Sequence, residues 1–288
     1  MLTSRVIVLC RSVKRDEGCS SEHRGAVAQQ PALTLFAAAI FLFAAAGALA
    51  QRVVFFDDFA GPRLSEMWQA SLPDAFQPSG SIVERYVGAP RYAFASFDGN
   101  SVLRMGKALR PRERCGWSSA GAFSGQDFLY EVRFNTLDQR RSVSIDGFIE
   151  IWILDASNSN HCDIISLFGG NYSSSREFFA GSSIDNVYTN YPFSYQNNTY
   201  YRLVLESGPG HNVRAAVLSD DGAELIGYSF DHSAAVFCAG FRIGLSQAMG
   251  LPTGPSPVDV AVDFVRVSTG GPGRNRRQGP LISPKAAR

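Results

Sequence analysis

The sequence has few of the residues that build helices and metal centres. It contains four histidines and five cysteines in 288 residues. It has no CxxC pair and no histidine-rich spacing, which argues against a zinc site. Beyond the N-terminus it lacks long runs of Ala, Leu, Glu and Lys at helical spacing, so little helix is expected. It is rich instead in glycine (27) and phenylalanine (21), with 45% hydrophobic residues, as in a globular, β-rich chain.

An excess of charge of one sign is also missing. The formal net charge is +1, and residues 1–50 carry five basic and three acidic residues, so removing them leaves 22 basic and 23 acidic residues. Residues 271–288 hold five basic residues and no acid, which leaves 17 basic and 23 acidic residues in 51–270, a net charge of −6. Such a domain has no electrostatic footprint for nucleic acid, so no nucleic-acid partner is expected. The Gly-, Pro- and Arg-rich segment 271–288 predicts a disordered basic tail.

One long apolar run exists, and it lies near the N-terminus. The stretch "PALTLFAAAIFLFAAAGALA" (31–50) follows a basic region and ends in Ala48-Leu49-Ala50. This pattern predicts a secretory signal, residues 1–50, that is removed near Gln51. An uncleaved anchor is the alternative, because about 20 apolar residues span a bilayer. We expect a secreted or periplasmic/extracellular protein with no stable membrane span after signal removal.

Three cysteines remain after residue 50, namely Cys115, Cys162 and Cys238. In an exported protein this odd number predicts one disulfide and one buried thiol. Spacing leaves all three pairings open.

Short segments of strand character fill residues 51–270, separated by turn signals such as Asp98-Gly99-Asn100 and Asp221-Gly222. Without intervening helices, such segments indicate a single all-β domain, an antiparallel sandwich or barrel. In "VDVAVDFVRV" (258–267) both alternating faces are partly apolar, as expected for a strand inside a two-layer stack.

The stretch "DGFIEIWILDAS" (146–157) places two acids, Glu150 and Asp155, in an apolar run. On an unbroken strand these positions have opposite parity and face opposite sides of the sheet. A carboxylate pair therefore requires a β-bulge near Leu154, which would turn Glu150, Trp152 and Asp155 to one cleft while Ile149, Ile151 and Ile153 enter the core.

The order of these segments resembles the concanavalin A-like lectin and glucanase sandwich, a jelly roll, and within it glycoside hydrolase family 16. The resemblance covers most of 53–268 and depends on "FFDDFAGPRLSEMW", "DGNSVLRM", "EIWILDASNSN" and "VDFVRVS". In that family a Glu-x-Asp-x-x-Glu strand carries the nucleophile first and the acid/base last. The resemblance implies that Glu150 matches the nucleophile and Asp155 the acid/base, while Trp152 replaces the middle Asp, so the motif is degenerate.

These departures argue against hydrolysis. A retaining glycosidase needs its carboxyl groups about 5–5.5 Å apart, and Asp is one methylene shorter than Glu. Alternatively, Glu150 pairs with an arginine such as Arg133 or Arg202, and Asp155 closes the strand before the turn "ASNSN".

Aromatic residues supply candidate glycan contacts, because sugar faces stack on rings. Trp152 is read either as a core residue or as a sugar platform beside Glu150. The segment "NVYTNYPFSYQNNTYY" (186–201) mixes rings with amides and hydroxyls, as in a sugar-binding loop or a sandwich end. The outer candidate contacts are Trp117, Tyr188, Tyr191 and Tyr195.

The resemblance also implies a structural Ca²⁺ held by Asp263 and by the carbonyl of Gly99, tying both chain ends to the sheet. Oxygen ligands suit this ion. The alternative is that Asp263 pairs locally.

Three functions remain open. The first is a secreted monomer that recognises a polysaccharide or other glycan on its concave sheet, without a required cofactor. The second is a retaining endo-β-glucan hydrolase, with Glu150 and Asp155 as its catalytic residues. The third is a non-catalytic structural or adhesion domain of the envelope, which would have a filled cleft and a buried Trp152.

Overall fold

The computed structural model describes residues 52–70, 85–110, 113–125, 127–137, 149–158, 161–168, 176–207, 212–231, 236–246 and 256–270. All of them belong to the compact unit Gly47–Arg288. The predicted signal 1–50 and basic tail 271–288 lie outside the described residues. The described ranges form strands and turns without a helix, and so contain no helix that could cross a membrane.

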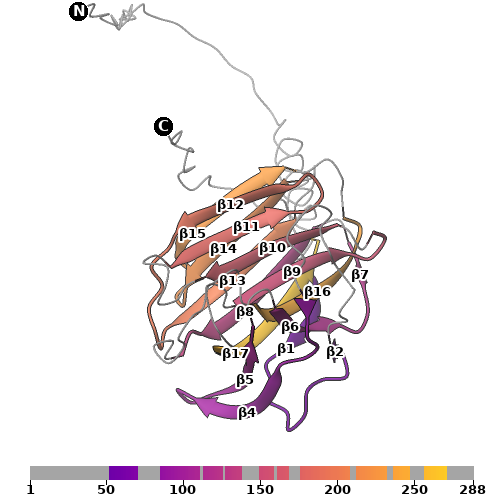
Figure 1. The fold of residues 1–288 in the computed structure, drawn as a ribbon. Coiled ribbons are helices and arrows are strands. Elements are labelled where there is room, and N and C mark those ends of the chain that lie inside the picture. The colour runs from indigo at the N-terminus through magenta and orange to yellow at the C-terminus, as the bar shows by residue number, and fades with distance from the viewer. Residues whose placement is uncertain are drawn as a thin grey trace, which may run out of the picture. The chain divides into compact units, whose positions relative to one another are not determined.

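One sheet has eight strands in the order β15-β14-β13-β8-β17-β5-β4, with β1 paired to β17 (Figure 1). Every pair in it is antiparallel. The strand bounds are β1 Arg52–Asp57, β4 Arg91–Phe97, β5 Asn100–Leu109, β8 Phe128–Asn135, β13 Tyr200–Ser207, β14 Asn212–Ser219, β15 Glu224–Asp231 and β17 Ser256–Thr269.

The other sheet has nine strands in the order β12-β11-β10-β9-β16-β6-β2, with β3 on β6 and β7 on β16. All of its pairs are antiparallel except the short parallel pair β3–β6. The strand bounds are β2 Trp68–Ala70, β3 Arg85–Tyr86, β6 Glu113–Ser119, β7 Phe123–Ser124, β9 Ile149–Asp155, β10 Cys162–Phe168, β11 Glu177–Ser182, β12 Val187–Pro192 and β16 Cys238–Ser246.

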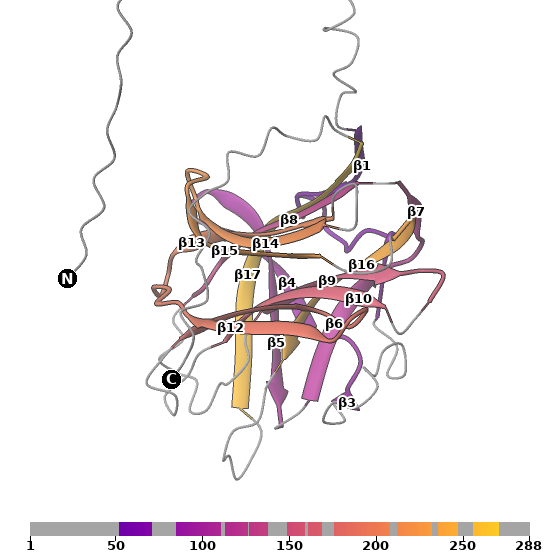
Figure 2. The ribbon, with the colours of Figure 1, turned by 90° about the horizontal axis from the view of Figure 1, so that it is seen from above.

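The two sheets pack face to face as separate layers, as Figure 2 shows. Alternate residues of each strand enter a shared apolar core, because side chains of a strand alternate between faces. Ile149, Ile151 and Ile153 of β9 enter it from one sheet. Val132 and Phe134 of β8 enter it from the other. The predicted all-β antiparallel sandwich is therefore confirmed.

The β4–β5 hairpin turns at Asp98 and Gly99, where the sequence predicts a turn. Both residues have positive φ, 50° and 80°, and Phe97 pairs with Asn100. A two-residue turn with positive φ at both positions follows the twist of the strands, and Asp-Gly is a preferred pair for it.

The apolar residues on both alternating faces of 258–267 have a different cause from the one predicted. The register of β17 against β8 shifts between Val262 and Phe264, so Asp263 is the extra residue of a bulge. Val258, Val260 and Val262 precede the bulge, and Val265 and Val267 follow it in the other phase. All five valines therefore enter one core, and the strand has a single core face.

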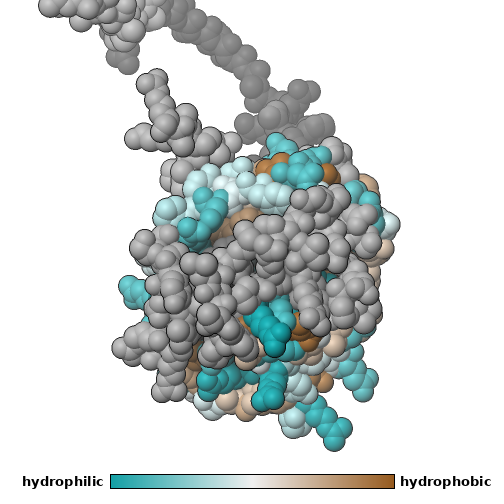
Figure 3. Space-filling view, in the orientation of Figure 1, coloured by the Kyte–Doolittle hydropathy of each residue, from teal (hydrophilic) through white to brown (hydrophobic). Residues whose placement is uncertain are grey.

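The face seen in Figure 3 is mixed in polarity where its residues are described. Among the coloured residues of the face in Figure 3, apolar residues form small separate groups bordered by hydrophilic ones. Scattered apolar residues of this kind are normal on a surface that meets water.

Candidate functional site

The candidate site lies on the outer face of the nine-stranded sheet, the face turned away from the eight-stranded sheet. Because Ile149, Ile151 and Ile153 enter the core, the intervening Glu150 and Trp152 of β9 point to the outer face. Directly opposed residues on neighbouring strands share a face. The outer face can therefore be traced across the sheet from the pairing of its strands.

Two rows of opposed residues cross this face. The first row is Ser118, Arg242, Trp152, Ile164, Gly181 and Tyr188. The second row is Gly116, Gly244, Glu150, Ser166, Phe179 and Asn190.

Asp155 does not share this face with Glu150. The pairing of β9 with β16 runs without a shift from Ile149 to Asp155, and its pairing with β10 is equally regular, so the bulge that a common face requires is missing from both ladders. Asp155 has the parity of Ile153. Its Oδ1 accepts hydrogen bonds from the Ser157 amide at 2.8 Å and the Ser157 hydroxyl at 2.5 Å, and its Oδ2 lies 3.5 Å from Nδ1 of His161. Asp155 thus closes the β9–β10 turn, the alternative considered for it from the sequence.

Glu150 forms a buried ion pair. Its side chain is 0% exposed, and its Oε2 lies 3.1 Å from Nη1 of Arg114 on β6. Gly244 of β16 stands opposite Glu150 and Gly116 of β6, and a Cβ there would lie only 3.3 Å from Oε1 of Glu150. The two glycines therefore leave room for the pair to form across β16. Pairing with an arginine such as Arg133 or Arg202 was the alternative considered for Glu150 from the sequence; Glu150 does pair with an arginine, but the partner is Arg114.

Trp152 is packed into the same cluster. It is 3% exposed and contacts Cys162 and Ile164 of β10. The guanidinium of Arg114 lies 4.8 Å from its ring centroid and that of Arg242 lies 5.7 Å away, both within cation–π range. Arg242 is held in turn by a hydrogen bond from its Nε to the Ser118 hydroxyl at 3.2 Å. Trp152 is therefore a buried outer-face residue rather than an open platform.

Three other predicted glycan contacts lie away from the outer face or are buried. Trp117 pairs with Ile243 of the core and packs edge-to-face on Tyr92 at 5.5 Å. Tyr191 packs against the core and lies 6.0 Å from the ring of Tyr228. Tyr195 is buried beneath the guanidinium of Arg176, 4.3 Å from its ring centroid, and burial raises its pKa to about 12.

Tyr188 is the predicted aromatic contact that is exposed on the outer face. It is 43% exposed, and its ring stacks on Phe179 at 5.8 Å and 19°. It lies over Gly181, where an added Cβ would come within 2.2 Å of the Tyr188 ring. Beside it, the Asn190 amide donates to the Glu177 carboxylate. The arrangement is a flat ring with polar groups at its edge, the composition of a sugar-binding surface.

Sequence reasoning missed Phe179, Asn190 and Glu177 as neighbours of this ring. The alternation in "VYTNYP" (187–192) separates Tyr188, Asn190 and Pro192 from Val187, Thr189 and Tyr191. That alternation could have assigned Tyr188 to the outer face and Tyr191 to the core face from the sequence alone.

The residues proposed for Ca²⁺ do not fit the ion. Oδ2 of Asp263 lies 2.5 Å from Nη1 of Arg133, so a cation already contacts this carboxylate. Gly99 is exposed in the β4–β5 turn. Within the part of the chain that the structure describes, no cluster of three or more acidic, cysteine or histidine side chains is placed to hold a metal.

The predicted disulfide is not formed, and Cys115, Cys162 and Cys238 are all free. Cys115 stands opposite Leu245 of β16, seven residues or about 23 Å along that strand from Cys238. Cys162 is on β10, separated from β16 by β9. A disulfide needs Cα atoms within about 7 Å, so the strand positions keep the three thiols apart.

The two packed sheets have the concanavalin A-like lectin and glucanase fold, as the likeness to solved structures shows. No protein-family model matches the sequence, and no curated protein matches it significantly. The likeness is found in solved structures. A family 16 endo-glucanase from Bacteroides ovatus, solved with a bound oligosaccharide derivative, is 16% identical with a TM-score of 0.51, over 74% of this chain and 99% of the other.

Two further structures are similar to the same extent. The endo-1,3-β-glucanase of Streptomyces sioyaensis is 15% identical with a TM-score of 0.50, over 76% of this chain and 96% of the other. An immunostimulatory antigen and pseudo β-1,3-glucanase of Mycobacterium tuberculosis is 14% identical with a TM-score of 0.50, over 76% and 99%. At these identities the likeness shows the fold.

Proposed function

We propose that the protein is an exported glycan-binding sandwich that holds a polysaccharide on the outer face of its nine-stranded sheet, the face predicted to be concave, without cleaving it. The observation that carries the proposal is the exposed ring of Tyr188, stacked on Phe179 in the same row as Trp152. Glycosidases and a pseudo-glucanase among the similar structures support the glycan as ligand.

The arrangement of the carboxylates argues against hydrolysis. Glu150 faces Arg114 in a buried pair, and Asp155 lies on the other side of the sheet in the β9–β10 turn. A retaining mechanism needs two carboxyl groups on one cleft, about 5–5.5 Å apart. This sheet does not place Glu150 and Asp155 in such an arrangement.

The experiment is retention on insoluble β-glucans together with a glycan array, using the wild-type chain and Tyr188→Ala. We expect binding by the wild type and at least fivefold weaker binding by the variant, because stacking of nucleic-acid bases on an aromatic ring contributes about 1–3 kcal/mol, and about 1 kcal/mol is a fivefold change in affinity. Tyr92→Ala is the matched control, since Tyr92 is 44% exposed but lies on β4 of the other sheet. Its binding should equal that of the wild type.

Two results would reject the proposal: no binding to any glycan in either format, or equal binding by Tyr188→Ala. Release of reducing sugar from mixed-linkage or β-1,3-glucan by the wild type, abolished in a Glu150→Gln protein that circular dichroism shows to be folded, would establish the hydrolase instead.

A structural or adhesion domain of the envelope is the second candidate. The burial of Trp152 favours it, because a filled outer face is the sign expected for that function. Absence of glycan binding together with attachment of the purified chain to isolated cell envelopes would support this candidate.

A further inference from the structure

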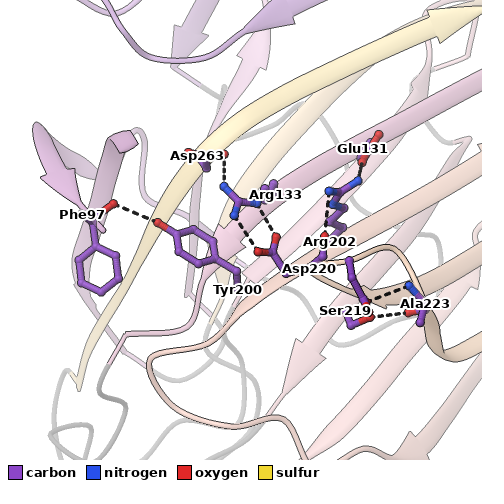
Figure 4. Close-up of polar contacts among 10 residues, drawn as sticks. Phe97, Glu131, Arg133, Tyr200, Arg202, Ser219, Asp220, Ala223 and Asp263 are labelled. Atoms are coloured by element: carbon purple, nitrogen blue, oxygen red, sulfur yellow. Dashed lines mark hydrogen bonds and ion pairs between the residues drawn. The ribbon is translucent and has the colours of Figure 1, made fainter. Parts of the chain in front are cut away.

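Arg133 of β8 is the centre of a polar cluster on the outer face of the eight-stranded sheet (Figure 4). Its Nε and Nη2 donate to the two carboxylate oxygens of Asp220 at 2.6 and 2.9 Å, and its Nη1 donates to Asp263 at 2.5 Å. Its guanidinium also lies 4.1 Å from the ring centroid of Tyr200. We call these four residues, Arg133, Asp220, Asp263 and Tyr200, the arginine clip.

The clip joins elements that are far apart in the sequence. Asp263 is the bulge residue of β17, lying between Val262 and Phe264, and Phe264 pairs with Arg133. Asp220 belongs to the β14–β15 turn, and its carbonyl also accepts a hydrogen bond from Arg202 of β13 at 2.9 Å. The guanidinium of Arg133 therefore connects β17 and the β14–β15 turn to β8 in the middle of the sheet.

Tyr200 extends the clip to the early hairpin. Its hydroxyl donates to the carbonyl of Phe97 at 3.4 Å, and the two rings meet edge to face at 6.2 Å. Phe97 is the last residue before the Asp98-Gly99 turn. The clip thus links Asp263 to the turn that carries Gly99, the two positions that the resemblance assigns to a calcium ion.

We propose that the arginine clip replaces the structural calcium in this protein, so that the fold is held at this point by an internal guanidinium and is indifferent to calcium. The charges support this. Arg133 meets two carboxylates, Asp220 and Asp263, and a second cation within about 4 Å of it would be repelled. The bidentate fork to Asp220 is the geometry that a guanidinium, and not a point charge, can supply.

The pKa values agree with this assignment. The hydrogen bond to Arg133 is the largest cause that lowers the pKa of Asp220. Stability from this contact is therefore present above the ordinary carboxyl pKa of 3.8 and is lost as the pH falls through the lower folded value.

The experiment measures Tm for the full chain in chelator and in millimolar calcium, for the wild type, Arg133→Ala and Arg104→Ala. Arg104 is the control, because it contacts Asp259 at 2.6 Å on the same face in a more exposed pair. We expect the same wild-type Tm in both buffers. Arg133→Ala should lower Tm by about 5 °C and Arg104→Ala by about 1 °C. Calcium should raise Tm only in Arg133→Ala, where Asp220 and Asp263 lose their shared guanidinium.

Several outcomes would overturn the proposal: a wild-type Tm that falls in chelator, an Arg133→Ala loss no larger than that of Arg104→Ala, or an Arg133→Ala protein indifferent to calcium. If Arg133→Ala does not fold, Arg133→Lys takes its place. Lysine keeps the charge but cannot form the bidentate contact, so the Tm of Arg133→Lys should be about 2 °C below that of the wild type. Calcium should leave the Tm of Arg133→Lys unchanged, as it does that of the wild type. An Arg133→Lys protein as stable as the wild type would refute the clip.

Discussion

Glu150, the residue that the resemblance matches to a nucleophile, forms a buried ion pair with Arg114. A carboxylate with 0% exposure facing a guanidinium at 3.1 Å is placed to stabilise structure rather than to attack a substrate. Removing one partner of a buried pair costs far more than the pair contributes, because the other charge stays buried.

We therefore expect Glu150→Gln to lower the free energy of unfolding by about 3 kcal/mol, since Arg114 would lose the ion-pair partner that balances its charge. Chemical denaturation followed by circular dichroism measures this change. Arg104→Gln serves as the control, because it removes an exposed pair with Asp259 and should cost about 1 kcal/mol or less. A Glu150→Gln protein as stable as the control would show that the pair is not structural.

The three thiols should differ in reactivity. Burial raises the pKa of Cys115 from 9.0 to about 12 and also raises that of Cys162, so each holds far less thiolate at mildly alkaline pH than an ordinary cysteine. Cys238 is half-buried. Alkylation of the native protein, mapped by mass spectrometry, should label Cys238 and spare the other two.

After unfolding in denaturant, all three thiols should be labelled. Equal labelling in the native state, or a peptide pair that remains disulfide-linked, would contradict this arrangement.

At the scale of the element, alternation in the sequence predicted which residues of β9 enter the core. It placed Ile149, Ile151 and Ile153 inside and Glu150 and Trp152 on the other face, as observed. The same rule applied to "ERCGWSS" (113–119) separates Cys115 and Trp117 from Arg114, Gly116 and Ser118. That parity would have removed Trp117 from the site.

Bulges and pairing partners could not be predicted in this way. The carboxylate pair required a bulge near Leu154, where the strand is regular, whereas a bulge lies at Asp263, and no local signal distinguishes the two positions. The partner of Glu150 was missed because Arg114 reaches it across a third strand at Gly244. Contacts of that kind depend on the order of the strands in the sheet, and local patterns in the sequence do not determine that order.

Gly181 of β11 leaves the space that the Tyr188 ring of β12 occupies, so a substitution at this glycine should change glycan binding. Gly181→Ala would place a Cβ 2.2 Å from the Tyr188 ring and 2.8 Å from the Val187 carbonyl oxygen, so the ring must move away from its position over residue 181. We expect glycan affinity to fall to that of Tyr188→Ala, with a loss of about 1–3 kcal/mol in the free energy of unfolding.

The matched control for this change is Gly121→Ala, where an added Cβ meets nothing within 4 Å and binding should stay unchanged. If Gly181→Ala binds glycan with the affinity of the wild type, the position of the Tyr188 ring does not determine binding and the prediction is wrong.

At the scale of the molecule, one apolar core joins the two sheets, with residues from strands of both. Trp68, Trp117 and Trp152 are the three tryptophans, and they lie on β2, β6 and β9 of the nine-stranded sheet. Tryptophan fluorescence therefore reports one sheet, while far-ultraviolet circular dichroism reports both.

Because the core is shared, both signals should give the same midpoint in a urea titration, as in a two-state transition. Separate midpoints would show that the two sheets unfold independently. The measurement needs no substitution, and Trp152→Phe provides a control for the outer-face contribution to fluorescence.

The alternation of β9 also bears on how such a protein diverges. Neighbouring codons along this strand specify opposite sides of the layer, so a change at position 150 or 152 acts on the outer-face cluster with Arg114, while 149, 151 and 153 keep the interior filled. A single substitution can therefore alter one side of this layer while the packing on its other side is kept.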